Sequence, residues 1–474
     1  MDVKDVDFFM CVNNLKCVPV LDLYSREWFE CHKNIVSINM YLHNNSDMID
    51  ILGDERMDAL VGKTETLIRE LITTYFVRFL NSEEITKINK DREMLQGIEK
   101  EFKSDNENAK KSDDTSAQSR IYNYISLYHE LTILNIFEFV LFSDYIYEKI
   151  DTHMINIFAY IYSNLVSFLK TNSNDYFVKP MNEMSISEML KEEQDKTQNI
   201  DRLKIYINVI NTLRNITDRI HLLNNTIVNK IVDYDILLIL IPLLEKKPWV
   251  HENYVFENNE WIKREDSTLP MTEKQLWLIL YTLILNRTCQ EKYELTNYRR
   301  NNILKLRKHM NEHLHEQLPP MKTLHTFIEH LYISKSIFPE NKNSCLIIDV
   351  VPEIFEEVKT DMLKNKRKII STLNSLTIEK DILGSISDMY LSVYEFSQQS
   401  GKESKCGAKA KGEKSEISKK SETAEQSKDE CYICDNCKEN AELQCSQCKR
   451  AYYCSKECQM KDWFNHREVC SNVT

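Results

Sequence analysis

Glycine is almost absent from the interior of this 474-residue chain, and its scarcity limits the folds that the chain can adopt. The chain has seven glycines, far below the usual share of ~7%, and none lies between residues 98 and 383. Tight β-hairpins and nucleotide-binding loops commonly use glycine, because it adopts positive φ angles and lets the backbone approach a ligand. Helices do not need it. The sequence therefore predicts an all-α body rather than an α/β enzyme or a β-sandwich.

The spacing of apolar residues predicts helices along this body. In 203–220 they recur every three or four residues, opposite a polar face that includes Lys204, Asn208 and Arg214. A short segment at 227–232 and the fully apolar run 236–244 follow, and a second series comprises 274–285, 301–318 and 321–334. No repeat of fixed length is present. From the density of helices we predict an armadillo- or HEAT-like stack over residues 1–400.

Three polar segments interrupt or follow this region. Residues 103–119 carry two alanines as their only apolar side chains, and residues 184–200 are nearly as polar, so we predict loops there, the first of them disordered. Residues 401–430 hold eight lysines against seven acids and one large apolar residue, Ile417. Such a segment cannot bury enough apolar surface to offset the entropy of ordering, and it predicts a flexible linker.

The overall charge and the apolar runs exclude several classes of protein. A formal net charge of −12 disfavours a general nucleic-acid binder, which needs a basic surface. The runs 131–142 and 236–244 are shorter than the ~20 apolar residues of a membrane span, so we expect none. The acidic N-terminal segment lacks the basic start of a signal peptide. We expect a chain in the reducing cytosol or the nucleus.

Eight of the fourteen cysteines crowd into residues 431–470, and clustered cysteines in a chain that is not secreted indicate metal ligands. From Cys434 onward, seven of these cysteines and His466 follow the pattern C-x2-C-x7-C-x2-C-x5-C-x3-C-x7-H-x3-C. These eight ligands predict two tetrahedral structural Zn²⁺ ions. Ligands four residues apart share a helix face, so we expect short helices to carry Cys454 with Cys458 and His466 with Cys470. The eight predicted ligands are Cys434, Cys437, Cys445, Cys448, Cys454, Cys458, His466 and Cys470.

This zinc module is expected to be structural and to bind proteins. Two ions use all eight ligands, whereas a catalytic zinc keeps an open position. Residues 431–474 hold six acidic and six basic side chains, so seven thiolates (−7) and two ions (+4) give about −3, which repels nucleic acid. One alternative metal site remains: His309-x-x-Glu312-His313 matches the pattern of a metallopeptidase helix but has no identifiable third ligand. We expect a protein without enzymatic activity.

The pattern resembles the MYND zinc finger, with Tyr453-Cys454, Gln459, Trp463 and His466 at characteristic positions. The resemblance implies two interleaved sites and a peptide-docking groove lined by Gln459 and Trp463. Two alternatives stay open. Cys431 with Cys434 is a rival for the first ligand pair, and Trp463 could instead pack inside the finger. The interleaved assignment places Cys434, Cys437, Cys454 and Cys458 on one zinc and Cys445, Cys448, His466 and Cys470 on the other.

The helical body adds a second resemblance, because a series of its segments matches the zinc finger MYND domain-containing protein 10 family in order. The first 130 residues match loosely, and residues 103–119 and 401–430 look expanded in this chain. The matching stretches are 203–220, Leu243-Leu244-Glu245, Pro248-Trp249, Trp261, Trp277, Tyr281, 304–307, Gln317-Leu318-Pro319, Phe327 and Pro352-Glu353-Ile354.

This family resemblance implies a cytoplasmic adaptor or co-chaperone for the preassembly of axonemal dynein arms in motile cilia, associated with centrosomes or centriolar satellites. Its MYND finger, residues 431–474, would dock a leucine-rich-repeat dynein assembly factor. Its helical body would engage dynein chains and cytosolic chaperones. The competing hypothesis is a nuclear transcriptional corepressor adaptor whose finger binds proline-rich peptides.

Overall fold

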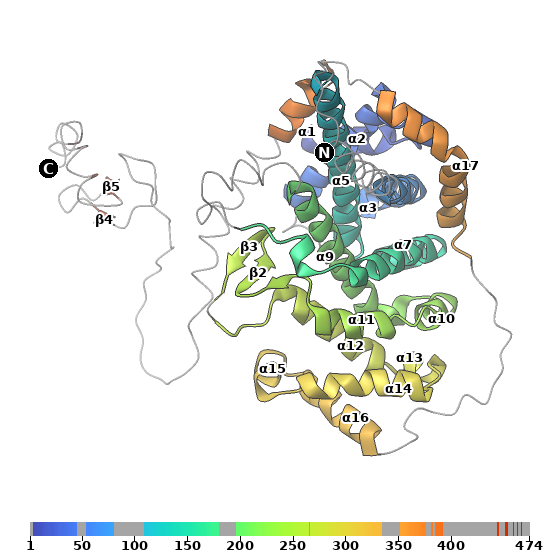
Figure 1. The fold of residues 1–474 in the computed structure, drawn as a ribbon, viewed down its shortest axis with the longest axis vertical. Helices are drawn as coiled ribbons and strands as arrows, with labels where there is room; N and C mark the ends of the chain where they lie inside the picture. The colour runs from blue at the N-terminus through green and yellow to red at the C-terminus, as the bar shows by residue number, and fades with distance from the viewer. Residues whose placement is uncertain are drawn as a thin grey trace, which may run out of the picture. The chain divides into compact units, whose positions relative to one another are not determined.

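The computed structural model describes residues 3–44, 54–79, 109–179, 196–264, 266–333, 351–375, 381–382, 384–391, 443–444 and 451–453, together with Cys458, Asp462 and His466. The chain divides into two compact units, Met1–Gln398 and Gln399–Thr474. The described part of the first unit is mainly helical (Figure 1). Its helices confirm the predicted all-α class, and the armadillo- or HEAT-like repeat stays a prediction.

The elements of the first unit follow one another with short connections where the chain is described (Figure 1). In chain order they are α1 (Val3–Asn14), η1 (Val20–Asp22), α2 (Arg26–Asn44), α3 (Asp54–Val61), helical residues 64–79, α5 (Ala109–Val140), α6 (Tyr145–Lys149), α7 (Asp151–Lys170), η3 (Ser173–Asp175), α9 (Lys196–Asp218), η5 (Ile220–Leu222), α10 (Asn225–Asp233), α11 (Leu237–Lys246), β1 (Val250–His251), β2 (Tyr254–Glu257), β3 (Glu260–Lys263), α12 (Met271–Leu285), α13 (Arg287–Lys292), α14 (Asn297–Leu304), η6 (Lys305–His309), α15 (Glu312–Gln317), α16 (Met321–Ile333), α17 (Glu353–Ser375) and helical residues 384–391.

Helix α9 forms where the apolar spacing predicted a helix, and it packs against α5, α7 and α12. Its apolar stripe faces the core, with Leu203, Ile210 and Leu213 at 0% exposure and Ile207 partly buried. Burying such a side chain contributes ~1.5–3 kcal/mol relative to leaving it in water. In Figure 1, α7, α11, α12, α14 and α16 follow one below the other. Helix α11 contains most of the apolar run 236–244.

Three predicted boundaries are wrong. Residues 109–119 of the expected disordered loop 103–119 form the start of α5, and residues 196–200 of the polar stretch 184–200 start α9. Both starts lack glycine and proline and contain good helix formers such as lysine and glutamine, so a helix can extend through them despite their polarity. Residues 103–108 and 184–195 lie outside the described part. The expected helix 301–318 is divided into α14, η6 and α15, because Asn311 caps α15 by accepting a hydrogen bond from the Leu314 amide at 2.8 Å.

A small antiparallel sheet, β1-β2-β3, lies between α11 and α12, in a region where the sequence predicted only helices. Its second turn uses Asn258 and Asn259, both at positive φ (50° and 66°), which is the backbone of a type I′ turn. Asparagine adopts this conformation more easily than other residues with a side chain, so the hairpin forms without glycine. On β3, Trp261 is buried and its indole donates to the Tyr176 carbonyl oxygen at 3.1 Å.

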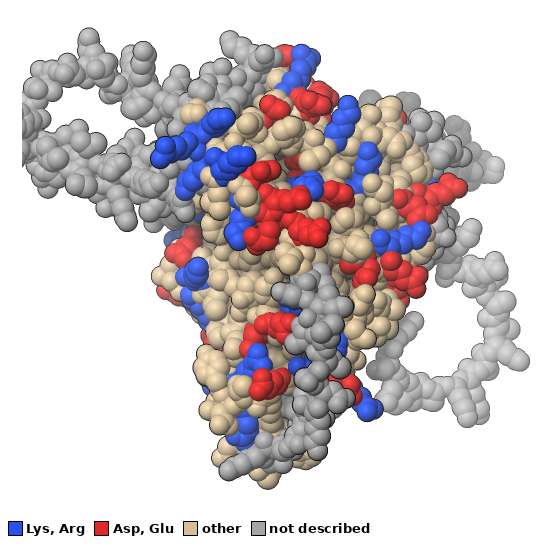
Figure 2. Space-filling model, turned by 90° about the vertical axis from the view of Figure 1, so that its right-hand side faces the viewer, with Lys and Arg blue, Asp and Glu red and all other residues tan. Residues whose placement is uncertain are grey.

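Helix α17 lies at one side of the unit and packs against α7, α5 and η1 (Figure 1). Its Phe355 packs on Phe76, and its Glu357 accepts from the Arg69 guanidinium at 2.8 Å. The molecular face on this side carries gathered Asp and Glu side chains and a separate group of Lys and Arg (Figure 2). No helix in the described part of the chain is both long and apolar enough to cross a bilayer.

Candidate metal centre

The described residues of the second unit include a short antiparallel pair, β4 (Leu443–Gln444) and β5 (Tyr452–Tyr453). Leu443 pairs with Tyr453, and Gln444 pairs with Tyr452. In the sequence, β4 ends one residue before Cys445 and β5 ends one residue before Cys454. The predicted ligands Cys445 and Cys454 therefore directly follow the two paired strands. The strand pairing restricts the backbone positions of both residues.

Tyr453 is the buried anchor of this unit. It has 0% exposure, and its hydroxyl donates to Asp462 Oδ2 at 2.9 Å. Its ring meets the His466 imidazole edge to face, with centroids 6.0 Å apart and an interplanar angle of 77°. This packing role of Tyr453 was not predicted from the sequence, where the residue stands only as part of the MYND resemblance. Its place directly before Cys454 in an otherwise polar segment was the sequence signal for a packing role.

Two of the eight predicted ligands, Cys458 and His466, fall within the described residues. Both have helical backbone, as their i, i+4 spacing predicted for the segments that carry them. His466 is 9% exposed and lies against Tyr453, so its imidazole is held in a protected setting, as a structural zinc ligand requires. Thiolate and imidazole are the donors that Zn²⁺ prefers, and these residues fit that ion.

The remaining predicted site residues lie outside the described part of the chain. Their pairing into two interleaved sites, the alternative role of Cys431, and the docking role of Gln459 and Trp463 stay predictions. These residues are Cys434, Cys437, Cys445, Cys448, Cys454, Cys470, Gln459 and Trp463.

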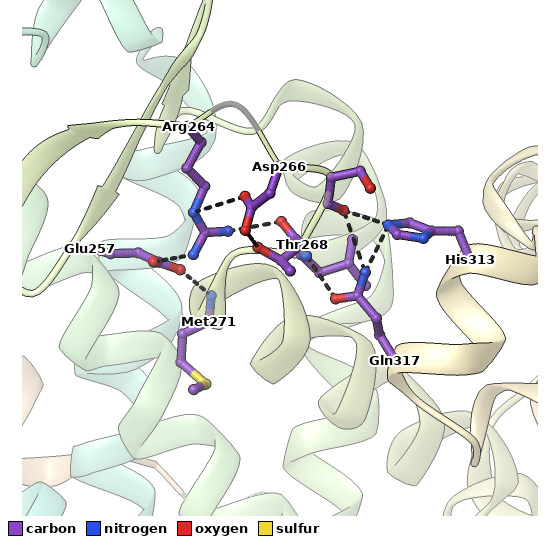
Figure 3. A network of polar contacts seen from close by, with 9 residues as sticks. Glu257, Arg264, Asp266, Thr268, Met271, His313 and Gln317 are labelled. Atoms are coloured by element: carbon purple, nitrogen blue, oxygen red, sulfur yellow. Dashed lines mark hydrogen bonds and ion pairs between the residues drawn. The ribbon is translucent and has the colours of Figure 1, made fainter. Parts of the chain in front are cut away.

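The alternative metallopeptidase pattern does not form one helical face. His309 is the last residue of η6, whereas His313 lies in α15, and Asn311 caps α15 between them. His313 Nε2 contacts the Ser267 carbonyl oxygen and lies 2.7 Å from the Gln317 amide nitrogen (Figure 3). Within the part of the chain that the structure describes, no group of three or more His, Cys, Asp or Glu side chains could hold a metal ion.

The contacts around His313 are those of a structural junction. Arg264, at the end of the sheet, pairs with Glu257, and Glu257 also accepts from the Met271 amide at 2.8 Å (Figure 3). Gln317 accepts from the Leu269 amide at 2.8 Å. These bonds tie the sheet, the start of α12 and α15 together, which explains why polar residues concentrate here without forming a reactive site.

Comparison with known proteins identifies the C-terminal module and extends the likeness into the helical unit. The MYND finger family matches residues 434–470. The Drosophila melanogaster zinc finger MYND domain-containing protein 10 homolog is 24% identical over 366 residues, which cover 75% of this chain and 79% of that protein. Tudor domain-containing protein 1 from Mus musculus and from Homo sapiens is 48% and 50% identical over 40 residues, only 8% of this chain and 3% of each relative. No solved structure matches the chain.

Proposed function

We propose that this chain, which carries a MYND zinc finger and resembles zinc finger MYND domain-containing protein 10 homolog along most of its length, is a non-enzymatic cytoplasmic adaptor for the preassembly of axonemal dynein arms. The observation that carries the proposal is the extent of the likeness. A match over 366 residues includes much of the helical unit, whereas a match to the finger alone spans about 40 residues in the Tudor proteins. The two units are therefore expected to act together.

The finger is the proposed docking module for a leucine-rich-repeat dynein assembly factor. The eight predicted zinc ligands in residues 434–470 favour two closed structural sites, which would leave no coordination position for a substrate. Tyr453, buried between Asp462 and His466, supports a rigid module. A rigid module loses little conformational entropy when a partner binds, and this favours a binding role.

The helical unit is the proposed scaffold for dynein chains and cytosolic chaperones. Its large buried core and its helical layers give a stable body with much solvent-exposed surface. Residues 401–430, predicted to be a flexible linker, would let the finger move over a distance from the helical unit. A flexible segment of about thirty residues spans roughly 30 Å by coil scaling. An adaptor of this design raises the effective concentration of a client near its assembly factor.

The proposal is tested in ciliated cells that lack the endogenous protein. Restoring the wild-type chain should restore dynein arms in electron micrographs of axonemes, and the tagged protein should be cytoplasmic. The Trp463→Ala chain should bind less of the leucine-rich-repeat assembly factor while keeping its zinc. Normal dynein arms in the cells without the protein would reject the proposal, and steady nuclear residence would favour the corepressor hypothesis.

A further inference from the structure

A groove of about 580 Å³ runs along the junction of α5 and α9 and is lined by amide and apolar side chains. Its volume falls within the range of ~300–1,000 Å³ that is typical of ligand sites. Besides asparagines and Glu138, the described residues that line it are Leu131, Phe139 and the 53% exposed Phe142, which give apolar surface, and His43. None of the described lining residues is a Lys or Arg. Five of its lining residues are asparagines: Asn135, Asn208, Asn211, Asn215 and Asn259.

Three of these asparagines form a row on α9. Asn208, Asn211 and Asn215 lie at i, i+3 and i+7 and therefore share one face of the helix. Contacts with α5 hold each carboxamide in place. Asn208 donates to Asn135 Oδ1, Asn215 donates to the Glu138 carbonyl oxygen at 2.9 Å, and Asn211 hydrogen-bonds the Glu138 carboxyl group.

Each carboxamide has more hydrogen-bonding capacity than these contacts use. An asparagine offers two N–H donors and an oxygen with two lone pairs, and the bond to α5 takes one of them. The remaining N–H donor and C=O acceptor are the same kinds of hydrogen-bonding group as those of a peptide main chain. A row of fixed carboxamides is thus suited to pair with the main chain of a bound peptide.

The spacing along α9 also fits an extended chain. Asn211 and Asn215 are four residues apart, a rise of ~6 Å along the helix axis. An extended peptide repeats every two residues, at ~6.6 Å. Main-chain groups that face the same side of such a peptide can therefore meet Asn211 and Asn215, while Phe139 and Phe142 offer apolar surface for its side chains.

Glu138 gives the groove a preferred charge. Its carboxyl group is the acidic group among the described lining residues; the residue is partly buried, and the carboxyl group is hydrogen-bonded by Asn211. A Lys or Arg side chain entering the groove would pair with the ionised form of this carboxyl group away from bulk water, where such an interaction is stronger than at an exposed site and favours loss of the proton.

We propose that this groove binds an extended peptide segment of a partner protein, which the α9 asparagines recognise through its main chain and which carries a Lys or Arg side chain that pairs with Glu138. The lining residues all belong to the helical unit, and the inference does not depend on a role in dynein assembly. It gives the body a peptide-recognition function of its own.

A phage-displayed library of random 12-residue peptides, panned against the full-length protein, provides the probe. Recovered peptides should carry a Lys or Arg and should bind the Asn211→Ala/Asn215→Ala chain about tenfold more weakly, which corresponds to the loss of one to two hydrogen bonds. Glu138→Gln should abolish the preference for Lys over an uncharged residue of the same length. Asn301→Ala removes an exposed asparagine from α14 and should bind as the wild type does.

N-methylation of single main-chain amides in a recovered peptide tests the same idea on the unaltered protein, so a folding defect in the variant cannot hide the result. Methylation at alternate residues should weaken binding at least as much as removal of a neighbouring side chain. Recovered peptides that bind the double variant unchanged, that tolerate N-methylation throughout, or that require a helical pattern of apolar residues would overturn the proposal. Recovery of no peptide that depends on Asn211 and Asn215 would do the same.

Discussion

The guanidinium group of Arg78 lies 2.9 Å from the carboxylate of Glu130 inside the helical unit, and their side chains are 4% and 0% exposed. Tyr160 donates its hydroxyl hydrogen to the same carboxylate oxygen at 2.8 Å. The pair joins helical residues 64–79 to α5, and Tyr160 adds α7. The packing of these three helical segments therefore depends on the buried charges of Arg78 and Glu130.

Glu130→Ala should destabilise the helical unit by ~3–5 kcal/mol, because it leaves the Arg78 charge buried without its carboxylate. Urea unfolding followed by circular dichroism measures the change. The matched control is Glu291→Ala, which breaks the exposed Arg287–Glu291 pair (91% and 50% exposed) and should cost less than ~0.5 kcal/mol. Similar losses for the two variants would contradict a structural role for the buried pair.

Glu138 makes stability depend on pH. Burial raises the pKa of its carboxyl group from 4.5 to about 7, while the hydrogen bond from Asn211 opposes the rise. Between these values the folded protein holds a proton that the unfolded chain has lost, so stability falls as the pH rises from about 5 to about 8. Relative to the wild type, Glu138→Gln should gain up to ~3 kcal/mol at pH 8 and little at pH 5. Unfolding measured at both pH values checks this, and a difference independent of pH would contradict it.

Glu252 adopts a left-handed backbone, with φ of 50°, in the exposed turn between β1 and β2. A residue with a Cβ atom pays an energy of ~1–2 kcal/mol there, and glycine does not. Allowing for the greater freedom of glycine in the unfolded chain, Glu252→Gly should stabilise the protein by ~0.5–1 kcal/mol. Glu260→Gly, in strand β3, should instead destabilise it by a similar amount. Thermal unfolding compares the two, and a loss of stability in both would show that the turn is not strained.

The purified chain should contain two zinc ions, measured by native mass spectrometry. Cys458→Ala and His466→Ala should each lower the zinc content, and because structural zinc supplies ~10–16 kcal/mol of folding free energy per site, the finger should unfold in both. The helicity of residues 1–398 should be unchanged in far-UV circular dichroism. Cys431→Ala is the matched control and should keep both ions. Zinc loss in Cys431→Ala but not in Cys437→Ala would establish the rival ligand pair, and a finger that stays folded after chelation would contradict the structural role of zinc.

Local sequence patterns were sufficient where one segment decides its own structure. The apolar stripe of α9 predicted a helix whose residues Leu203 and Leu213 are buried, and the four-residue spacing from His466 to Cys470 predicted the helical backbone found at His466. The sheet was not predicted, because the scarcity of glycine was taken to exclude tight hairpins. Asn258 and Asn259 satisfy the same turn, and this pair of asparagines between two β-forming runs was a readable sign.

The sequence by itself determined the helical class of the body and the chemistry of the finger, since helix periodicity and ligand spacing are short-range properties of the chain. Only the tertiary structure decided which distant residues meet. Arg78 and Glu130 are 52 positions apart, and Asn215 donates to the backbone of Glu138, 77 positions away. These contacts depend on how whole helices pack against one another, and no local pattern specifies that arrangement. The buried ion pair and the asparagine-lined groove therefore belong to the fold rather than to any segment of the sequence.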